Sequence, residues 1–173
     1  AAFAMAEGLL AAEDRAGAIE RFSVLAESQD ANAAALSRFR EADVRFLFDD
    51  KSAALSLLDG IAGAGDVDPI FRDFALITAA QHRLDGGDVP AALDSLEGRA
   101  EPGSAMHYSE RETFALGKLE GGALPEAAEL LRQLQADTTT PDDMRRRAGE
   151  LLDAIGMDND ASEPFPTSNE AAP

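Results

Sequence analysis

Apolar side chains recur along this chain at spacings of three and four residues, which is the period of an amphipathic α-helix. The alternation of apolar and polar residues that marks a half-buried β-strand is hard to find. Alanine and leucine are abundant, and β-branched residues are few. The pattern therefore predicts an all-α fold. The expected helices span residues 2–12, 15–27, 32–48, 51–62, 70–84, 90–99, 105–120, 125–136 and 141–155.

The first eight predicted helices form four copies of one helical hairpin. Ala18, Ala54, Ala92 and Ala127 align as anchors, and subtraction of their numbers gives spacings of 36, 38 and 35 residues. Each anchor has another alanine 12 residues earlier, a bulky apolar residue 8 residues earlier and a large apolar residue 4 residues later. Small residues let two helices approach closely while bulky neighbours fill the space beside them. We therefore expect these positions to form the interior of each hairpin.

The segments between paired helices have residues typical of helix ends. Three copies have an aspartate just before the second helix, where its carboxylate can accept hydrogen bonds from free N–H groups. The residues at this position are Asp14, Asp50, Asp88 and, in the fourth copy, Ala123. Pro90 and Pro125 fall in the first helical turn, which tolerates proline. The glycine pairs at 86–87 and 121–122 suit a tight turn.

The stretch AAQHRLDGGDVPAALDSLEGRA at 79–100 resembles the tetratricopeptide repeat, with a small residue, a bulky residue, a Gly-Asp turn, and then alanine and a large apolar residue. This resemblance covers residues 1–136 and implies a right-handed solenoid of four such hairpins. The ninth helix would cap the solenoid, giving one domain at 1–156. The chain departs from the repeat consensus because it has no tryptophan, only one tyrosine, and spacings above 34 residues.

A narrower resemblance follows from the order of several segments. AAFAMAEGLLAAEDRAGAIERFSVLA, SRFREADVRFLFDDKSAAL, PIFRDFALITAA, RETFALGKLEGGALPEAAELLRQL and PDDMRRRAGELLDAIG are together similar to the tetratricopeptide-like ancillary subunit of the bacterial Sec translocon. This resemblance implies an upstream membrane helix and a location at the periplasmic face of the inner membrane. The implied partners are translocon subunits and a periplasmic chaperone. A cytoplasmic repeat adaptor with another partner is the alternative.

The charge of the chain narrows the choice of partners. The formal net charge is −18, from 15 basic and 33 acidic residues. Such a field repels nucleic acid and anionic membrane surfaces, so neither is expected as a direct partner. No stretch approaches the length of a membrane span, and membrane association would require an anchor outside this sequence. Cysteine is absent, which removes disulfides, thiolate nucleophiles and cysteine-ligated metals.

The C-terminal segment, 157–173, differs from the rest of the chain. It has no basic residue, four acidic residues and three prolines, so we expect a disordered tail. Asp158 and Asp160 raise the question of a calcium loop, but the glycine and the terminal glutamate of such a loop are missing. We expect no metal and no cofactor.

Candidate catalytic residues are few. His82 and His107 are the only histidines, and they lie in different predicted hairpins. The run MHYSERETF around His107 holds a hydroxyl, a base and an acid, but adjacent helical residues point in different directions. Ser109 to Glu112 are better explained as the start of a helix. GIAGAGD lacks the lysine of a phosphate-binding loop, and Arg145–Arg147 span most of a helical turn without forming one stripe. We predict that the protein is not an enzyme.

The repeat resemblance implies that the first helix of each hairpin lines a concave binding surface. The residues implied to face it are Phe39, Asp43, Phe46, Leu47, Gln81, Leu84, Asp85, Glu112, Leu116 and Glu120. Apolar anchors among carboxylates suit an extended or helical segment that carries Arg or Lys beside its own apolar residues. Phe39, Phe46 and Leu84 could instead simply pack between hairpins.

Three functions remain to be compared. A protein-interaction scaffold associated with the translocon is the leading hypothesis. A self-associating structural protein, in which one copy receives a helix or tail of another, is the second, so a homo-oligomer is possible. A hydrolase is the third, and it would need a pocket that unites His82 or His107 with paired carboxylates.

Overall fold

A computed structural model describes residues 2–99, 104 and 106–156. This described part is all-helical, with nine helices and no β-strand, which confirms the predicted fold class. The predicted tail at 157–173 lies outside the described residues. The helices are α1 (Ala2–Ala11), α2 (Arg15–Leu25), α3 (Ala31–Leu47), α4 (Lys51–Ala62), α5 (Pro69–Asp85), α6 (Val89–Leu96), α7 (His107–Glu120), α8 (Leu124–Ala136) and α9 (Asp142–Ala154).

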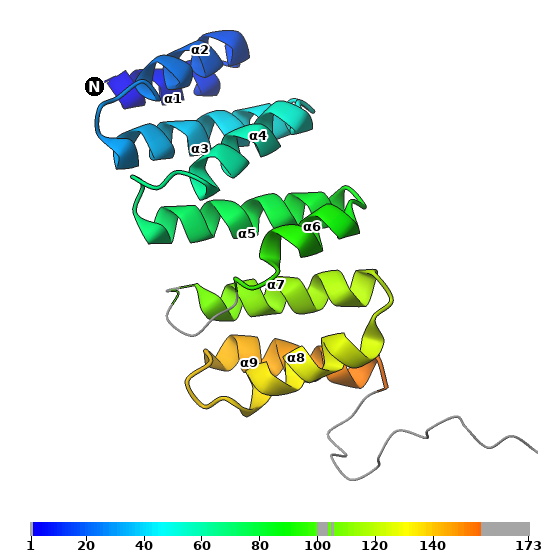
Figure 1. The fold of residues 1–173 in the computed structure, drawn as a ribbon. Coiled ribbons are helices and arrows are strands. Elements are labelled where there is room, and N and C mark those ends of the chain that lie inside the picture. Colours follow the sequence, from blue (N-terminus) through cyan, green and yellow to red (C-terminus); the bar gives the residue numbers. More distant parts are fainter. Residues whose placement is uncertain (1, 100–103, 105, 157–173) are drawn as a thin grey trace, which may run out of the picture.

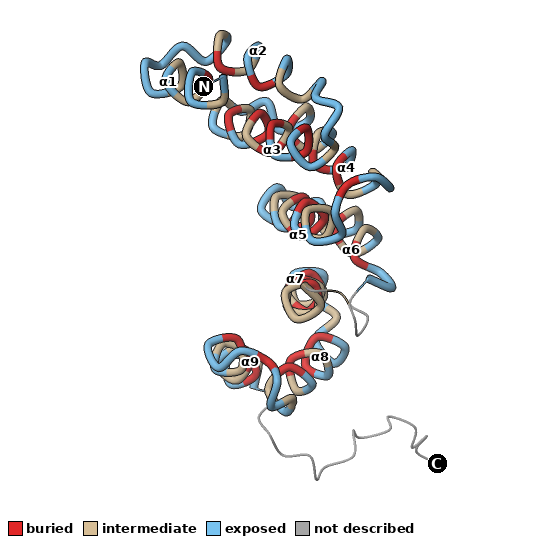
Figure 2. Tube along the Cα trace, turned by 90° about the vertical axis from the view of Figure 1, so that its left-hand side faces the viewer, coloured by how far each residue is buried: buried red, intermediate tan, exposed pale blue. Residues whose placement is uncertain are grey.

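The helices pack one after another in chain order, so that the molecule is an elongated stack of antiparallel pairs (Figure 1). In addition, α3 packs against α5 and α5 against α7. Figure 2 shows that the stack curves, with α1, α3, α5, α7 and α9 on its inner side and α4, α6 and α8 on its outer side. We call the surface of α3, α5 and α7 on the concave side the inner face.

The repeated positions form the interior of the hairpins, as the sequence predicts. All four anchor alanines are buried, and so are the alanines 12 residues earlier and the large apolar residues 4 residues later. The bulky residue 8 positions before each anchor is buried only at Leu84, and is half-buried at Leu10, Phe46 and Leu119. The small residues therefore bring the helices together, and the bulky ones close the sides of each contact.

The four turns between paired helices have one backbone geometry. A residue with positive φ stands five positions before each anchor: Glu13 (62°), Asp49 (64°), Gly87 (79°) and Gly122 (78°). The N–H of the next residue then donates back across the helix end, as Asp88 does to the Arg83 carbonyl over 2.8 Å. This hydrogen bond recurs in the other three turns at 2.8–2.9 Å. It is the 6→1 bond of a Schellman motif, and it makes the four hairpins equivalent in backbone as well as in side chains.

The predicted helix caps are confirmed in two of three cases. Asp14 accepts from Gly17 N over 3.0 Å, and Asp88 accepts from Ala91 N over 3.3 Å. The prediction for Asp50 is wrong, because its carboxylate accepts a 2.6 Å hydrogen bond from Arg45 and caps no N–H group. The charged guanidinium of the preceding helix competes successfully with the neutral backbone donors of α4. Pro90 and Pro125 lie in the first turns of α6 and α8, as expected.

Candidate protein-binding face

The outward positions of α3 and α5 on the inner face follow the repeat. In both helices four residues at successive spacings of four, three and four lie exposed or half-buried on one side. Each residue of α3 has its counterpart 38 residues later in α5, which is the spacing of their anchors. The pairs are Leu36 and Phe74, Arg40 and Thr78, Asp43 and Gln81, and Leu47 and Asp85.

An apolar patch occupies one end of this face. Leu36 is 45% exposed, Ile70 is 48% exposed and Phe74 is 50% exposed. Beneath them Phe39 is buried, and its ring centroid lies 5.4 Å from that of Phe74 and 6.4 Å from that of Phe71. Leu36 is one turn from Phe39, and Ile70 is one turn from Phe74. The side chains Leu36, Ile70 and Phe74, which we call the apolar patch, therefore extend the core cluster of α3 and α5 out to solvent.

A stacked pair joins α3 to α5 further along the same helices. The ring of Phe46 lies 3.5 Å from the imidazole of His82, with an angle of 13° between the planes. Leu47, the next residue, is 70% exposed. His82 of the adjacent hairpin thus half-buries Phe46, whereas the side chain of Leu47 is exposed to solvent.

Arginine side chains on the inner face neutralise some of its carboxylates. Arg40 makes two hydrogen bonds to Glu7 of α1, at 2.7 and 2.8 Å, and a third to Asp43 at 2.8 Å. These contacts hold the pKa of Glu7 below its ordinary value, because the guanidinium stabilises the carboxylate. The two hydrogen bonds from Arg40 to Glu7 also join the second hairpin to the first.

The fourth hairpin is tied to the last helix in the same way. Arg147 of α9 bonds both oxygens of Glu112, at 2.9 and 3.0 Å, and also Asp143 at 2.9 Å. Beside this pair Leu116 and Leu151 line a small pocket with a volume of about 370 Å³. Glu112 and Leu116, which were both predicted for the binding surface, therefore line the same pocket.

Phe46 and Leu116 of the predicted site are half-buried, and the other eight residues divide into three groups. Phe39 and Leu84 are buried, so for them the alternative of packing between hairpins describes the structure. The carboxylates Asp43 and Glu112 are engaged by arginines of the same chain. The remaining positions with exposed side chains are Leu47, Gln81, Asp85 and Glu120. Within the described residues, Asp85 and Glu120 make no ion pair.

Sequence reasoning missed the three members of the apolar patch. Leu36, Ile70 and Phe74 are as apolar as the core residues around them, and periodicity does not separate an exposed apolar position from a buried one. One signal was available, because Leu36 and Phe74 stand at the same position of successive repeats. Their equivalence marks them as one feature of the surface and not as two isolated exposures.

The histidines lie in structural contacts in the described part of the chain. His107 Nδ1 is 3.0 Å from the Ser104 carbonyl oxygen, and the Tyr108 hydroxyl bonds to Asp137 over 3.1 Å and to Thr139. No hydrogen bond joins His107 to a hydroxyl or carboxylate among the described residues. A search of those residues finds no group of three histidine or acidic side chains that could hold a metal ion.

Glu110 is a buried acid near these residues whose pKa is raised. Its side chain is buried, and one carboxylate oxygen has no hydrogen-bond partner in the described structure. Burial raises the pKa of Glu110, and the negative charge of Asp73 adds to the rise. Ser104, Arg99 and His107 act in the opposite direction.

Comparison of the chain with protein-family models, with curated proteins and with solved structures finds no significant match. The resemblances to the tetratricopeptide repeat and to the translocon subunit therefore remain sequence-based predictions. Among the described residues no helix is long and apolar enough to cross a membrane.

Proposed function

We propose that this chain is a non-enzymatic protein-interaction scaffold, built as a solenoid of four tetratricopeptide-like hairpins with α9 as its cap. Its inner face binds protein segments that carry apolar anchors flanked by Arg or Lys. The observation that carries this proposal is the apolar patch, where Leu36, Ile70 and Phe74 each expose about half of their surface and Phe74 packs on the buried ring of Phe39. Exposed apolar groups on a concave surface are typical of protein-binding sites.

Charge selects among the segments that fit this patch. Asp85 and Glu120 stand exposed on α5 and α7 without an internal ion pair in the described residues. The whole chain also carries −18, which attracts a basic segment and speeds its encounter. The apolar patch supplies the contact area, and the carboxylates set the preferred charge of the partner.

A narrower proposal concerns the cellular role. We propose that the partners are translocon subunits or a periplasmic chaperone, at the periplasmic face of the inner membrane. The support is the ordered similarity of five segments to the translocon's ancillary subunit. Recovery of translocon subunits with the tagged chain from solubilised membranes, and their loss in Phe74→Ser, is the expected result. Equal recovery by wild type and Phe74→Ser contradicts the use of the apolar patch.

Defined peptides test the scaffold function without knowledge of the natural partner. One fluorescent peptide alternates leucine with arginine, a second has glutamate in place of arginine, and a third has serine in place of leucine. Fluorescence anisotropy should rank the leucine–arginine peptide as the tightest, with each other peptide at least about tenfold weaker. Equal binding of all three, or binding of none, contradicts the proposal. Light scattering on the chain alone tests self-association, because a monomer over a wide concentration range would exclude that alternative.

A further inference from the structure

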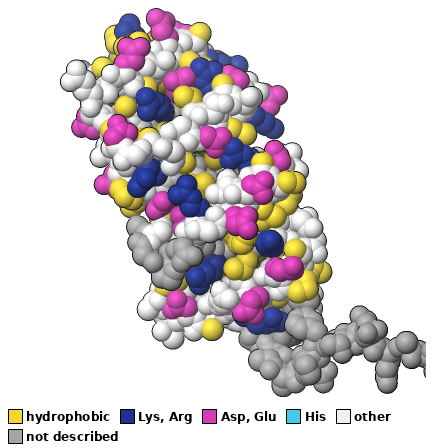
Figure 3. Space-filling view, viewed as in Figure 1, with side chains coloured by type: hydrophobic (Ala, Val, Ile, Leu, Met, Phe, Trp, Pro, Cys, Tyr) yellow, Lys and Arg dark blue, Asp and Glu magenta, His cyan; other side chains and the backbone are white. Residues whose placement is uncertain are grey.

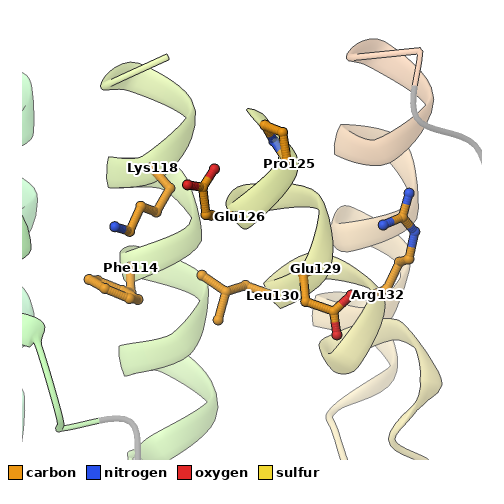
Figure 4. A pocket seen from close by; sticks show the side chains of 7 residues that line it. All are labelled: Phe114, Lys118, Pro125, Glu126, Glu129, Leu130 and Arg132. Carbon is orange, nitrogen blue, oxygen red and sulfur yellow. The ribbon is translucent and has the colours of Figure 1, made fainter. Parts of the chain in front are cut away.

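A groove on the outer side of the stack lies between α7 and α8 (Figure 4). Its volume is about 470 Å³, and its apolar wall is formed by Phe114 of α7 with Pro125 and Leu130 of α8. Lys118, Glu126, Glu129 and Arg132 contribute charged side chains. Figure 3 shows hydrophobic side chains exposed on this side of the molecule across α6 to α8, with charged groups among them. The groove is separate from the inner face.

The groove is open because α6 ends early. Counting from the anchors, α4 continues 8 residues to Ala62, whereas α6 continues only 4 residues to Leu96. Glu97 leaves the helix with extended backbone angles (φ −60°, ψ 126°). As a result α6 packs along less of α7 than α4 does along α5. The missing turn of α6 leaves the ring of Phe114, which packs on the cluster around Leu96, only half-buried.

Lys118, which lines the groove together with Arg132, lacks among the described residues the carboxylate partner that its counterparts have. Lys118 stands 9 residues before its anchor, as do Arg45 and Arg83. Arg45 pairs with Asp50 over 2.6 Å, and Arg83 pairs with Asp59 of α4 over 2.6 Å. Among the described residues Lys118 has no ion pair. Its ammonium lies 5.1 Å from the centroid of the Phe114 ring.

The early end of α6 also explains this missing partner. Asp59 stands 5 residues after its anchor, and the residue at that position of the next repeat is Glu97. Because Glu97 lies beyond the last turn of α6, its carboxylate makes no ion pair with Lys118. The groove thus combines an apolar wall with a cation whose carboxylate is displaced. An occupant with one aromatic side chain and one acid close to it would satisfy both.

The described chain ends next to the start of α8, the helix that forms one wall of this groove (Figure 4). Helices α8 and α9 are antiparallel neighbours, so the end of α9 lies next to the start of α8, where Pro125 is found (Figure 1). Packed helix axes are about 8–10 Å apart. Nine residues lead from Gly156 to Phe165, and an extended chain of that length reaches about 30 Å. Phe165 can therefore reach the groove within one molecule.

The segment that follows Gly156 has the composition that the groove requires. Its sequence at 157–173 contains one aromatic residue, Phe165, between Pro164 and Pro166, and Glu163 lies two residues before it. Flanking prolines restrict the backbone before binding and so reduce the entropy that binding removes. We propose that the 157–173 segment of the same molecule occupies the outer groove, with Phe165 against Phe114 and the Glu163 carboxylate on Lys118.

The charge of the chain favours the same molecule over a second copy as the source of this segment. Two chains of −18 repel each other, whereas a tethered segment has a high effective concentration at its own groove. Glu126 and Glu129 lie in the groove as well, so the acid of the segment is directed toward the Lys118 end. This proposal concerns the outer side and does not depend on the function proposed for the inner face.

The absence of cysteine in the chain permits a direct test. A nitroxide label is attached to the cysteine of Ser162→Cys in the full chain, three residues before Phe165. The amide signals of Glu126 and Leu130 are then followed by NMR. We expect the label to broaden these signals, and Phe165→Ala to remove the broadening. Lys118→Gln should lower the ratio of docked to free segment about two- to fivefold, as expected for one exposed ion pair. Lys51→Gln, which changes the only other lysine, should leave that ratio unchanged.

Three results would overturn the proposal. The first is no broadening at Glu126 and Leu130. The second is broadening that persists in Phe165→Ala, because contact would then not depend on the aromatic side chain. The third is equal broadening when the label is carried only by unobserved chains mixed with unlabelled, isotope-enriched ones, because the occupant would then be a second copy.

Discussion

The rings of Phe39 and Phe74 are in contact, with centroids 5.4 Å apart, yet Phe39 is 8% exposed and Phe74 is 50% exposed. One aromatic contact therefore spans the boundary between the core and the inner face. Phe39 is placed to stabilise the packing of α3 on α5, whereas half of Phe74 is available to a partner. The two residues should respond differently to substitution.

Phe39→Ala should lower the free energy of unfolding by about 3 kcal/mol, because it removes a buried ring and leaves a cavity. Phe74→Ala should cost about 1 kcal/mol, since only half of its ring is removed from water by folding. Urea unfolding followed by circular dichroism measures both values. Equal losses in the two variants would contradict the assignment of Phe39 to the core and Phe74 to the surface.

Glu7→Gln should reduce stability at neutral pH by about 0.5 kcal/mol, the scale of a partly exposed ion pair. The hydrogen bonds from Arg40 depress the pKa of Glu7 below its ordinary value of 4.5. A depressed carboxyl pKa contributes stability above the unfolded value, and this contribution is lost as the pH falls through the folded value. The difference between wild type and variant should therefore disappear below pH 4.5, in unfolding curves measured across that range.

Glu110→Gln should increase stability at neutral pH, whereas Glu7→Gln should reduce it. Burial raises the pKa of Glu110, so its ionised form costs stability at neutral pH, and the neutral amide removes that cost. We expect a gain of about 1 kcal/mol at pH 7, which vanishes as the pH falls below the unfolded pKa and both proteins carry a neutral side chain. A variant less stable than wild type at pH 7 would show that the carboxylate is better satisfied than its unpartnered oxygen indicates.

Glu13→Gly should stabilise the first hairpin by about 0.5–1 kcal/mol, because Glu13 holds a φ of 62° that favours glycine. Gly122→Ala tests the same turn in reverse. A Cβ at Gly122 would meet nothing within 4 Å, so its cost comes from the backbone alone. Thermal unfolding of both variants measures these effects, and shifts of the same sign would refute the equivalence of the four turns.

The helices and the packing inside each hairpin could be predicted from the sequence because local signals agree with the global fold. The anchors, the proline positions and the caps at Asp14 and Asp88 all depend on residues within one hairpin. The predicted end of α6 at residue 99 is three residues too late, because Gly98 adopts a φ of 71° and Glu97 is already extended. That early end opens the outer groove, which apolar periodicity alone does not reveal.

The surface could be predicted only in part, because it depends on contacts between hairpins. Asp43 and Glu112 are engaged by arginines of the same chain, which the sequence does not predict. Phe39 is buried because α5 brings two phenylalanine rings against it. Which of several apolar residues stays exposed is decided by the position of the neighbouring helix, and a single sequence does not specify that position.

The central claim is that the apolar patch of the inner face binds protein segments with apolar and basic residues. Its most direct test compares Phe74→Ser with Val24→Ser, which alters a similarly exposed apolar residue on α2, outside the inner face. We predict that Phe74→Ser weakens binding of the leucine–arginine peptide at least about tenfold, as for the loss of a buried aromatic anchor, while Val24→Ser leaves it unchanged. Equal affinities of the two folded variants would contradict the claim.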